Sequence, residues 1–469
     1  MVADFVNGLT EVLKQFGDAL VHGDLSLVWT NEALLFAIIL AATILIYLTL
    51  FSSWMFWRNK LFEESFKSIL LEIRIPREIL KSPRAMEQVF FSLHALRNTA
   101  GDSGEYFLDG EVVRWYSLEV VSFGGEVHFY VRCPFKQRNL VEAAFLGYYQ
   151  DIELLEVDDY STTVFPRTLQ DVYAQGYDMY GAELHLARPD AYPLRSYVDF
   201  DTADEAQLFD PVTNMIEVLS KIKPEEMVGI QILFYPLGPT WRKEWKPLVE
   251  ELRQSKQKKG GAKTAVMFPG GPMPHLDIKK SEEDEFGKLS RAFMRTPGET
   301  EVLKRLEANL DKPAFCALIR FLYFSPKSSY YDSFPRRAVI GTFNQYSDLG
   351  SNYFKLNYKG ATRVKWRNFP HFFPGLRGDA RKHILLYNYQ ERNFPPEHWM
   401  GKVLTSSLFQ WNIKTKTFQI TTESLATIFH LPTMPVLTAP HIRRVESKKG
   451  GPPAGLPIFG DEEKIKQFM

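Results

Sequence analysis

The stretch ALLFAIILAATILIYLTLFSSWMFW, residues 33–57, contains no charged residue, and no comparable run occurs elsewhere in the sequence. The hydrocarbon core of a bilayer, about 30 Å thick, needs about 20 apolar residues in a helix, so this run is long enough to span it. Aromatic residues flank the run, as is typical of the two membrane surfaces. The residues expected to hold this anchor in the membrane are Trp29, Leu35, Ile44, Trp54, Trp57 and Arg58.

The charges on either side of this run predict its orientation. Residues 1–32 contain one lysine and five acids, whereas Arg58, Lys60 and Lys67 follow the run closely. Because basic residues are enriched on the cytoplasmic side, we expect a single-pass protein of the cell membrane whose large C-terminal part is cytoplasmic. A cleaved signal peptide is the alternative, but the preceding segment is acidic, the run is too long, and no small-residue cleavage site follows.

The charge balance and the cysteines set the broad class of the remaining chain. The full sequence has 56 basic and 56 acidic residues, and without the one lysine and five acids of residues 1–57 it has 55 and 51. This mild excess suits a protein beside an anionic leaflet and is not typical of a nucleic-acid-binding domain. Cys133 and Cys316 lie in apolar, strand-like runs, which predicts buried, reduced thiols.

Residues 58–165 follow the order βαββαβ, which is typical of the ferredoxin-like fold. The pattern predicts strands at 71–75, 115–123, 126–133 and 152–157, with helices from Ser82-Pro83 and over 139–149. In the first strand, alternation places Leu71, Ile73 and Ile75 inward and Glu72 and Arg74 outward. Gly124-Gly125 is expected to form the turn of a hairpin.

Residues 166–360 repeat this order around an insertion. Strands are expected at 182–187, 228–234, 314–324 and 353–358, with helices from Asp210-Pro211 and around 339–346. The insertion, residues 237–313, holds a helix with Trp241 and Trp245, a Lys/Gly/Pro-rich loop, and a charged helical arm over 281–310.

The predicted fold is α+β: one N-terminal transmembrane helix, two ferredoxin-like units, and a Pro/Gly-rich tail. The expected segments are an extracytoplasmic amphipathic segment (1–32), the membrane helix (33–57), a first ferredoxin-like domain (58–165), a second ferredoxin-like domain (166–360), a C-terminal α/β region (361–447) and an extended tail (448–469). The C-terminal region is expected to hold a helix over 380–389, a strand with Phe418 and Ile420, and a short helix over 423–430.

The search for catalytic motifs predicts a protein that is not an enzyme and that holds no cofactor or metal. GGAKT, residues 260–264, lacks the glycine that a phosphate loop needs directly before its lysine, so a solvated basic loop is the better interpretation. The histidines show no metal-ligand spacing, and His430 is expected to be a packing or capping residue.

Three basic clusters are candidates for binding. One is the insertion loop around Lys256–Lys263; another is the series Arg363, Lys365 and Arg367, interleaved with Trp366 and Phe369. Such alternation can grip single-stranded nucleic acid, but a solvated surface or contact with anionic lipid is the more ordinary interpretation. The third cluster precedes the tail, and the residues expected to dock a partner there are Arg443, Arg444, Lys448, Lys449 and Leu456.

Three stretches resemble a known family. TTESLATIFHLPTMPVLTAPHIRRVESKKGGPPAGLP, residues 421–457, resembles the segment just ahead of the motor in HerA/FtsK-like, type IV secretion and conjugation ATPases. LEIRIPREILKSPRAMEQVF (71–90) and FDPVTNMIEVLSKIKPEEMVGIQILFYPLGPTW (209–241) are similar to the N-terminal region of that family. The resemblance implies the membrane-proximal, non-motor half of a translocating machine.

The sequence departs from this family because no Walker A motif follows the Pro-rich connector within its 469 residues. We therefore expect a scaffold or docking subunit of a type IV secretion-like or conjugative DNA-translocation machine, which recruits a separately encoded P-loop ATPase. The alternative is a membrane-tethered nucleic-acid-binding module. Expected partners are the bilayer and that ATPase, with DNA and a second copy of the chain as further candidates.

Overall fold

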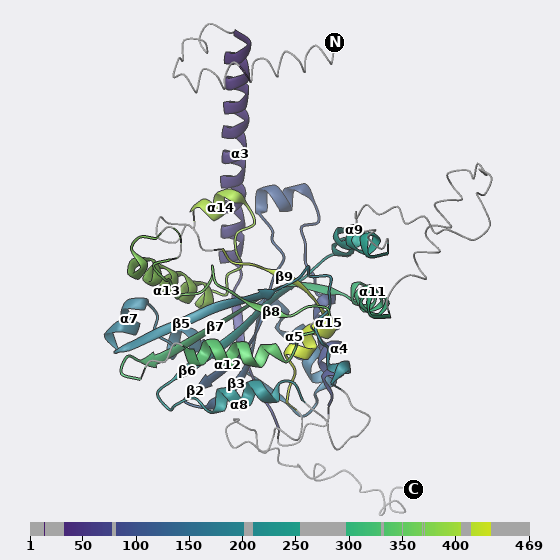
Figure 1. The fold of residues 1–469 in the computed structure, drawn as a ribbon, viewed down its shortest axis with the longest axis vertical. Coiled ribbons are helices and arrows are strands. Elements are labelled where there is room, and N and C mark those ends of the chain that lie inside the picture. Colours follow the sequence, from purple (N-terminus) through teal and green to yellow (C-terminus); the bar gives the residue numbers. More distant parts are fainter. Residues whose placement is uncertain are drawn as a thin grey trace, which may run out of the picture. The chain divides into compact units, whose positions relative to one another are not determined.

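A computed structural model gives the structure of this protein. The residues that it describes are 14, 32–76, 81–200, 210–253, 297–329, 333–348, 350–367, 369, 371–404 and 414–432. They fall into two compact units (Figure 1). Unit 1 comprises the described parts of Met1–Phe66, Thr99–Val112 and Pro395–Trp411, and unit 2 comprises the rest.

Unit 1 is built on one long helix, α3 (Glu32–Ser65). Its apolar run holds neither proline nor glycine, so nothing interrupts the helical hydrogen bonds. The hydroxyls of Thr43, Thr49 and Ser53 donate to the carbonyl oxygens four residues earlier, at 2.7–2.8 Å, so these polar groups are satisfied without water. Within the described residues, α3 is the one helix long and apolar enough to cross a membrane.

Two short elements of unit 1 pack on α3. They are a π-helical turn, η1 (Glu105–Asp109), and a short helix, α14 (Trp399–Leu404). Ser52 and Met55 of α3 are buried in unit 1, in contrast to the residues before them.

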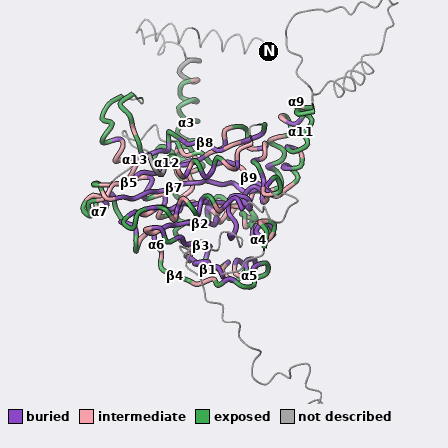
Figure 2. Tube along the Cα trace, turned by 60° about the horizontal axis from the view of Figure 1, so that its bottom comes forward, coloured by how far each residue is buried: buried purple, intermediate pink, exposed green. Residues whose placement is uncertain are grey.

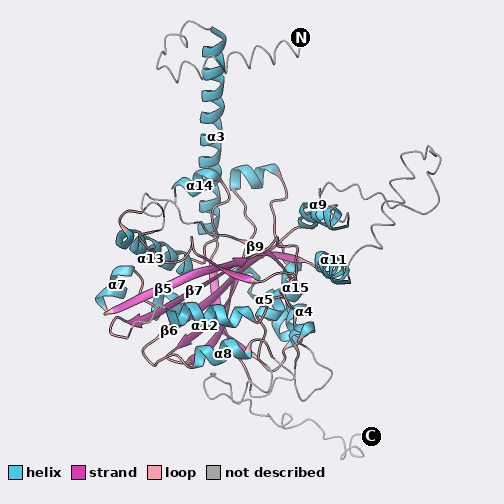
Figure 3. Ribbon diagram, viewed as in Figure 1, coloured by secondary structure: helices cyan, strands magenta, loops and turns pink. Residues whose placement is uncertain are grey.

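Unit 2 contains one nine-stranded sheet (Figure 3). Its strands are β1 (Ser68–Arg74), β2 (Tyr116–Phe123), β3 (Glu126–Pro134), β4 (Glu153–Val157), β5 (Tyr177–Leu186), β6 (Met227–Pro236), β7 (Ala314–Pro326), β8 (Phe354–Asn357) and β9 (Phe418–Thr421). The order is β4-β1-β3-β2-β6-β7-β5-β8, β9 pairs with β7, and every pairing is antiparallel. The sheet is continuous because β2 pairs with β6 along eight residues.

One face of this sheet carries the largest apolar core. The helices that contribute to it are α4 (Pro83–Ala95), α5 (Arg138–Tyr148), α8 (Thr213–Ser220), α12 (Ser333–Asn344) and α15 (Thr422–Ile428). The opposite face is covered by α6 (Tyr160–Thr163), α7 (Leu169–Ala174) and α13 (Pro374–Gln390). Most strands are therefore largely buried, as the purple tube in Figure 2 shows, whereas the edge strand β4 contains no buried residue.

Part of the insertion forms a third, smaller core. Helices α9 (Trp241–Arg253) and α11 (Pro297–Leu310) pack on each other through Trp241, Val249 and Leu306. Residues 254–296, which hold the predicted loop, the GGAKT motif and the start of the helical arm, lie outside the described residues. Two short 3-10 turns, η2 (Phe135–Gln137) and η3 (Tyr197–Asp199), complete the elements.

The structure confirms the predicted mixture of helices and antiparallel strands and the N-terminal apolar helix. Gly124 and Gly125 form the β2–β3 turn with φ of 58° and 98°, a conformation that favours glycine. Cys133 and Cys316 are buried free thiols, as expected. One prediction was wrong: Glu72 does not face solvent, because helices cover both faces of the sheet and its side chain is buried. The amphipathic segment and the tail lie outside the described residues, apart from Lys14.

Candidate functional site

Five of the six predicted anchor residues, Leu35, Ile44, Trp54, Trp57 and Arg58, lie on α3. Ile44 is half exposed within the apolar run, and Trp54 and Trp57 are exposed where the run ends. The guanidinium of Arg58 lies over both indoles, 5.8 and 5.7 Å from the ring centroids, which is cation–π geometry. Trp29 and the side chain of Leu35 lie outside the described residues. The aromatic and basic groups typical of a membrane boundary thus occur together at the C-terminal end of the run.

The predicted docking residues Arg443, Arg444, Lys448, Lys449 and Leu456 lie outside the described residues. The last described element before them is α15, which packs on α4.

The last helix is fixed to the core by His430, which is buried as predicted. One ring nitrogen, Nδ1, lies 2.8 Å from the carbonyl oxygen of Ala426, and the other, Nε2, lies 2.9 Å from Oδ1 of Asp210. The side chain thus caps α15 and links it to Asp210, which lies just before α8. This confirms the predicted packing and capping role.

A row of mainly polar side chains crosses the sheet on the face below α13. Its members are register partners on seven adjacent strands: Glu72 (β1), Tyr130 (β3), Glu119 (β2), Gln231 (β6), Arg320 (β7), Glu183 (β5) and Asn357 (β8). All seven are buried. Register partners project to the same face, so the row is continuous from one end of the sheet toward the other.

Sequence reasoning missed this row, although a signal was present. In several strands of the row a polar residue interrupts apolar neighbours, as in LEI (71–73), LEV (118–120), IQI (230–232) and IRF (319–321). An alternating pattern assigns such positions to solvent, and only the second layer of helices places them inside.

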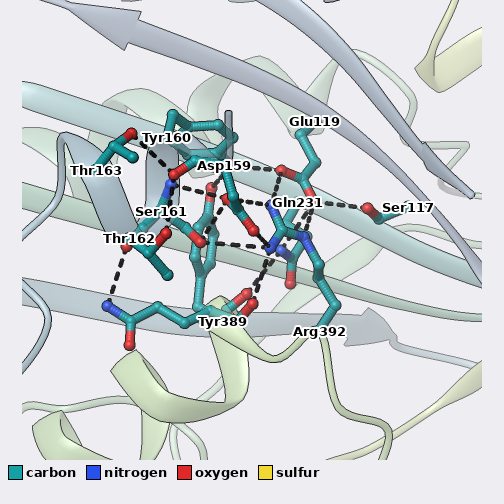
Figure 4. Close-up of polar contacts among 11 residues, drawn as sticks. Ser117, Glu119, Asp159, Tyr160, Ser161, Thr162, Thr163, Gln231, Tyr389 and Arg392 are labelled. Atoms are coloured by element: carbon teal, nitrogen blue, oxygen red, sulfur yellow. Dashed lines mark hydrogen bonds and ion pairs between the residues drawn. The ribbon is translucent and has the colours of Figure 1, made fainter. Parts of the chain in front are cut away.

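Glu119 is the centre of a dense network (Figure 4). Arg392, which follows α13, donates from Nε and Nη2 to the two carboxylate oxygens of Glu119 at 2.8 and 3.1 Å, a bidentate pair. Ser117, Tyr160 and Gln231 donate to the same carboxylate at 2.6, 2.5 and 3.1 Å.

The same arginine reaches a second acid at the edge of this network. Arg392 also pairs with Asp159, whose carboxylate caps α6 by accepting from the backbone N–H of Ser161 at 2.9 Å. The hydroxyl of Tyr160 lies 2.8 Å from that of Tyr389 on α13 (Figure 4). The network thus joins β2, β6, α6 and the end of α13.

Glu183, farther along the row, has a sparser environment. Arg320 gives it one contact, from Nε to Oε1 at 3.3 Å, and donates its other groups to the carbonyl oxygens of Asn388 and Asn393. Thr415 and Asn357 donate to the carboxyl at 3.1 and 3.4 Å. No bidentate ion pair forms between Glu183 and Arg320.

The two glutamates differ in pKa accordingly. Burial acts to raise the pKa of Glu119, but the charge and hydrogen bonds of Arg392, with Ser117 and Tyr160, hold it below its ordinary value. Burial raises the pKa of Glu183 above its ordinary value, and Arg320 only partly opposes this. The Glu119 network is a closed structural tie between sheet and helix, since its carboxylates already accept from protein donors.

Comparison with known proteins identifies a family without an assigned activity. The sequence profile of a family described as a domain of unknown function, DUF8128, matches residues 62–357, and the chain belongs to this family. The match contains every strand of the polar row but neither Arg392 nor α15. The curated proteins include no match to this chain. Within the described residues, no three His, Cys, Asp or Glu side chains form a metal-binding group.

Proposed function

We propose that this protein is a membrane-anchored scaffold of a type IV secretion-like or conjugative DNA-translocation machine, which recruits a separately encoded P-loop ATPase and performs no catalysis itself. In this proposal α3 is a single-pass anchor in the cell membrane. The large C-terminal part is cytoplasmic, and the tail from Arg443 to Leu456 docks the motor.

One observation carries the proposal: the described parts of the three stretches that resemble the ATPase family meet in one core. The ring centroids of Phe90 in the first stretch and Phe234 in the second are 5.8 Å apart. Thr422 in the third donates to Glu87 in the first at 3.3 Å, and His430 contacts Asp210 in the second. Residues as far apart as Glu87 and Thr422, 335 positions in the sequence, therefore belong to one contiguous piece of the fold, and the proposed docking segment follows it in the sequence.

We also interpret the sheet as two ferredoxin-like halves. The first four strands lie in the order β4-β1-β3-β2, and the next four in the corresponding order β8-β5-β7-β6. Each half follows the antiparallel arrangement expected of βαββαβ units, and β2 and β6 join the halves edge to edge. In this large sheet each central strand is hydrogen-bonded to a neighbour on both sides, which suits a rigid platform.

The orientation of the anchor is supported by charge alone. Lys60 and Lys67 follow the aromatic cluster at Trp57, whereas the segment before the run is acidic. The basic side of a spanning helix favours the cytoplasm, which would place a nucleotide-dependent motor in the compartment that contains ATP.

Charge reversal in the tail tests the docking function. The full-length chain, tagged and extracted from native membranes, should carry a P-loop ATPase that mass spectrometry identifies and quantifies. Arg443→Glu with Arg444→Glu should reduce the amount of that ATPase at least tenfold. The matched control is Lys258→Glu with Lys259→Glu, the same change of charge in the insertion loop, which should leave it unchanged. Equal recovery from the tail variant would contradict docking through this segment.

A second candidate function, binding of nucleic acid, is supported by the segment between β8 and α13. Residues 358–373 contain four lysine and arginine residues and no acid. Lys365, Trp366 and Arg367 are all exposed there, as are Phe372 and Phe373. Cations interleaved with aromatic rings can bind single strands.

This alternative predicts a distinct result. Single-stranded DNA should bind the full-length chain with an affinity that falls steeply as salt rises, and Trp366→Ala should weaken binding about tenfold. If the variant binds DNA like the wild type, or if no salt-dependent binding occurs, the segment is not a nucleic-acid site.

A further inference from the structure

We propose that two segments packed on α3 insert into the boundary between lipid headgroups and acyl chains and so fix the depth of the anchor. We call these segments, residues 99–112 and 395–404, the collar. The proposal rests on the membrane span proposed above and adds a second, interfacial contact to it.

Specific contacts place the collar at one level of α3. The indole Nε1 of Trp54 donates to the carbonyl oxygen of Phe107 at 2.9 Å, and the rings of Phe51 and Phe107 are 5.9 Å apart. On the other collar segment, the backbone N–H of Met400 donates to Oγ of Ser52 at 3.0 Å. The collar therefore meets α3 from Phe51 onward, and its contacts extend to Arg58.

This level is where the hydrocarbon core is expected to end. From Ala33 to Phe51, α3 contains 19 residues with no charge, which span about 28 Å at the rise of an α-helix. That length nearly equals the thickness of a hydrocarbon core, about 30 Å. Beyond Phe51, Ser52 and Met55 are covered by protein rather than available to lipid. A bilayer whose hydrocarbon core contains residues 33–51 thus places its headgroup region beside the collar.

The collar presents to its surroundings the side chains that this region accepts. Its exposed large residues are Tyr106, Phe107, Leu108, Trp399, Val403 and Leu404, and between 40% and 63% of each is accessible. Two exposed tryptophans of α3, Trp54 and Trp57, lie at the same end of the apolar run. Aromatic residues with one polar and one apolar end concentrate at membrane interfaces, and aliphatic neighbours add buried area.

The charges of the collar do not favour anionic lipid, so the expected contact with the membrane is made by its apolar side chains. Residues 99–112 contain four acids and no basic residue, and residues 395–404 add one acid, Glu397, and one lysine, Lys402, so acids exceed basic residues by four in the collar. Two of these acids accept from backbone N–H groups of the same segment: Asp102 from Glu105 at 2.8 Å and Glu105 from Gly101 at 2.6 Å. Asp109 lies 3.9 Å from the guanidinium of Arg58. An acidic segment gains nothing from an anionic leaflet, so the expected occupant is a zwitterionic headgroup boundary.

Depth-dependent fluorescence quenching tests this proposal in the full-length chain. Single cysteines replace Leu108 and Val403 in the collar (Leu108→Cys, Val403→Cys), Ile44 in the span (Ile44→Cys), and Leu140 on α5 as an exposed control (Leu140→Cys). Cys133 and Cys316 are buried, so a maleimide dye added to the folded protein reacts with the introduced thiols. The labelled proteins are inserted into phosphatidylcholine vesicles that contain lipids spin-labelled near the headgroup or deep in the chain.

The expected result is at least threefold stronger quenching of the dye at residues 108 and 403 by the shallow spin label than by the deep one. Ile44 should show the reverse order, and Leu140 should be quenched only by aqueous iodide. Replacing a third of the lipid with phosphatidylserine should leave the collar signal unchanged.

Different failures have different meanings. Lipid quenching at residue 44 together with iodide quenching at 108 and 403 would overturn the collar alone. Protection of 108 and 403 from both quenchers would also overturn it, because a protein, such as a second copy, would then cover these residues. Iodide quenching at residue 44 would overturn the span and the collar together.

Discussion

Glu119 and Glu183 lie in the same row of the same sheet, and both are completely buried, yet their pKa values move in opposite directions. The difference follows from the partner arginine. Arg392 presents two N–H groups to Glu119, whereas Arg320 presents one to Glu183 and gives the others to backbone carbonyls. Burial alone therefore does not determine the charge of a core carboxyl; the number and geometry of its donors do.

The comparison also separates two structural roles. The Glu119 network ties α6 and the end of α13 to the middle of the sheet through a charged pair. The Glu183 site fixes the same turn after α13 mainly through Arg320 and the carbonyls of Asn388 and Asn393. In the second site the glutamate is an accessory group, and in the first it is required to balance a charge.

The largest effect is expected from removing the cation of the first site. Arg392→Met leaves Glu119 and Asp159 without their shared partner, and an uncompensated buried charge should lower the free energy of unfolding by about 3–5 kcal/mol. Urea unfolding of the full-length chain in detergent, followed by tryptophan fluorescence, measures this loss. Arg320→Met is the matched control and should cost less, because Glu183 can take up a proton. Equal costs would contradict the comparison.

A smaller effect is expected from neutralising the acid of the first site. Glu119→Gln keeps the shape of the side chain but weakens the hydrogen bonds to Arg392, which should cost about 2 kcal/mol at neutral pH. Because the folded-state pKa of Glu119 lies below its ordinary value of 4.5, its stabilisation is fully present above pH 4.5 and is lost as the pH falls through the folded value. The cost of the variant should therefore shrink in acid. A cost that stays constant down to the lowest pH at which the chain folds would show that Glu119 is not ionised.

Single hydroxyls provide a finer test. Tyr160 donates to Glu119 at 2.5 Å, whereas Thr415 donates to Glu183 at 3.1 Å. The shorter hydrogen bond to a carboxylate contributes more than the longer one, so Tyr160→Phe should cost about 1.5 kcal/mol and Thr415→Val less than about 1 kcal/mol. The same unfolding measurement at pH 7 decides the order. The reverse order would mean that the hydrogen bond to Glu183 stabilises the fold more than the one to Glu119, which would contradict the comparison.

Much of the fold could be predicted from the sequence, because its strands and helices have regular periods. The expected strand 126–133 and helix 139–149 lie within about one residue of β3 and α5. The site could not be predicted in the same way. The alternation around Glu72 shows which residues share a face, but it does not reveal whether a second layer of helices covers that face. Arg392 is 273 residues from Glu119, and no local pattern pairs two residues so far apart.

The smallest effect is expected at Glu183. The stability of its variant relative to the wild type should change with pH in the opposite direction to that of the Glu119 variant. Its folded-state pKa lies above the ordinary value of 4.5, so its contribution to stability is fully present below pH 4.5 and is lost as the pH rises through the folded value. Glu183→Gln fixes a neutral group of the same shape, and Arg320 keeps its two carbonyl acceptors. At pH 4 the variant should unfold within about 1 kcal/mol of the wild type. As the pH rises toward 8, its stability relative to the wild type should increase, whereas that of Glu119→Gln should not. If both variants respond to pH in the same direction, the geometry of the arginine does not set the charge of these buried acids.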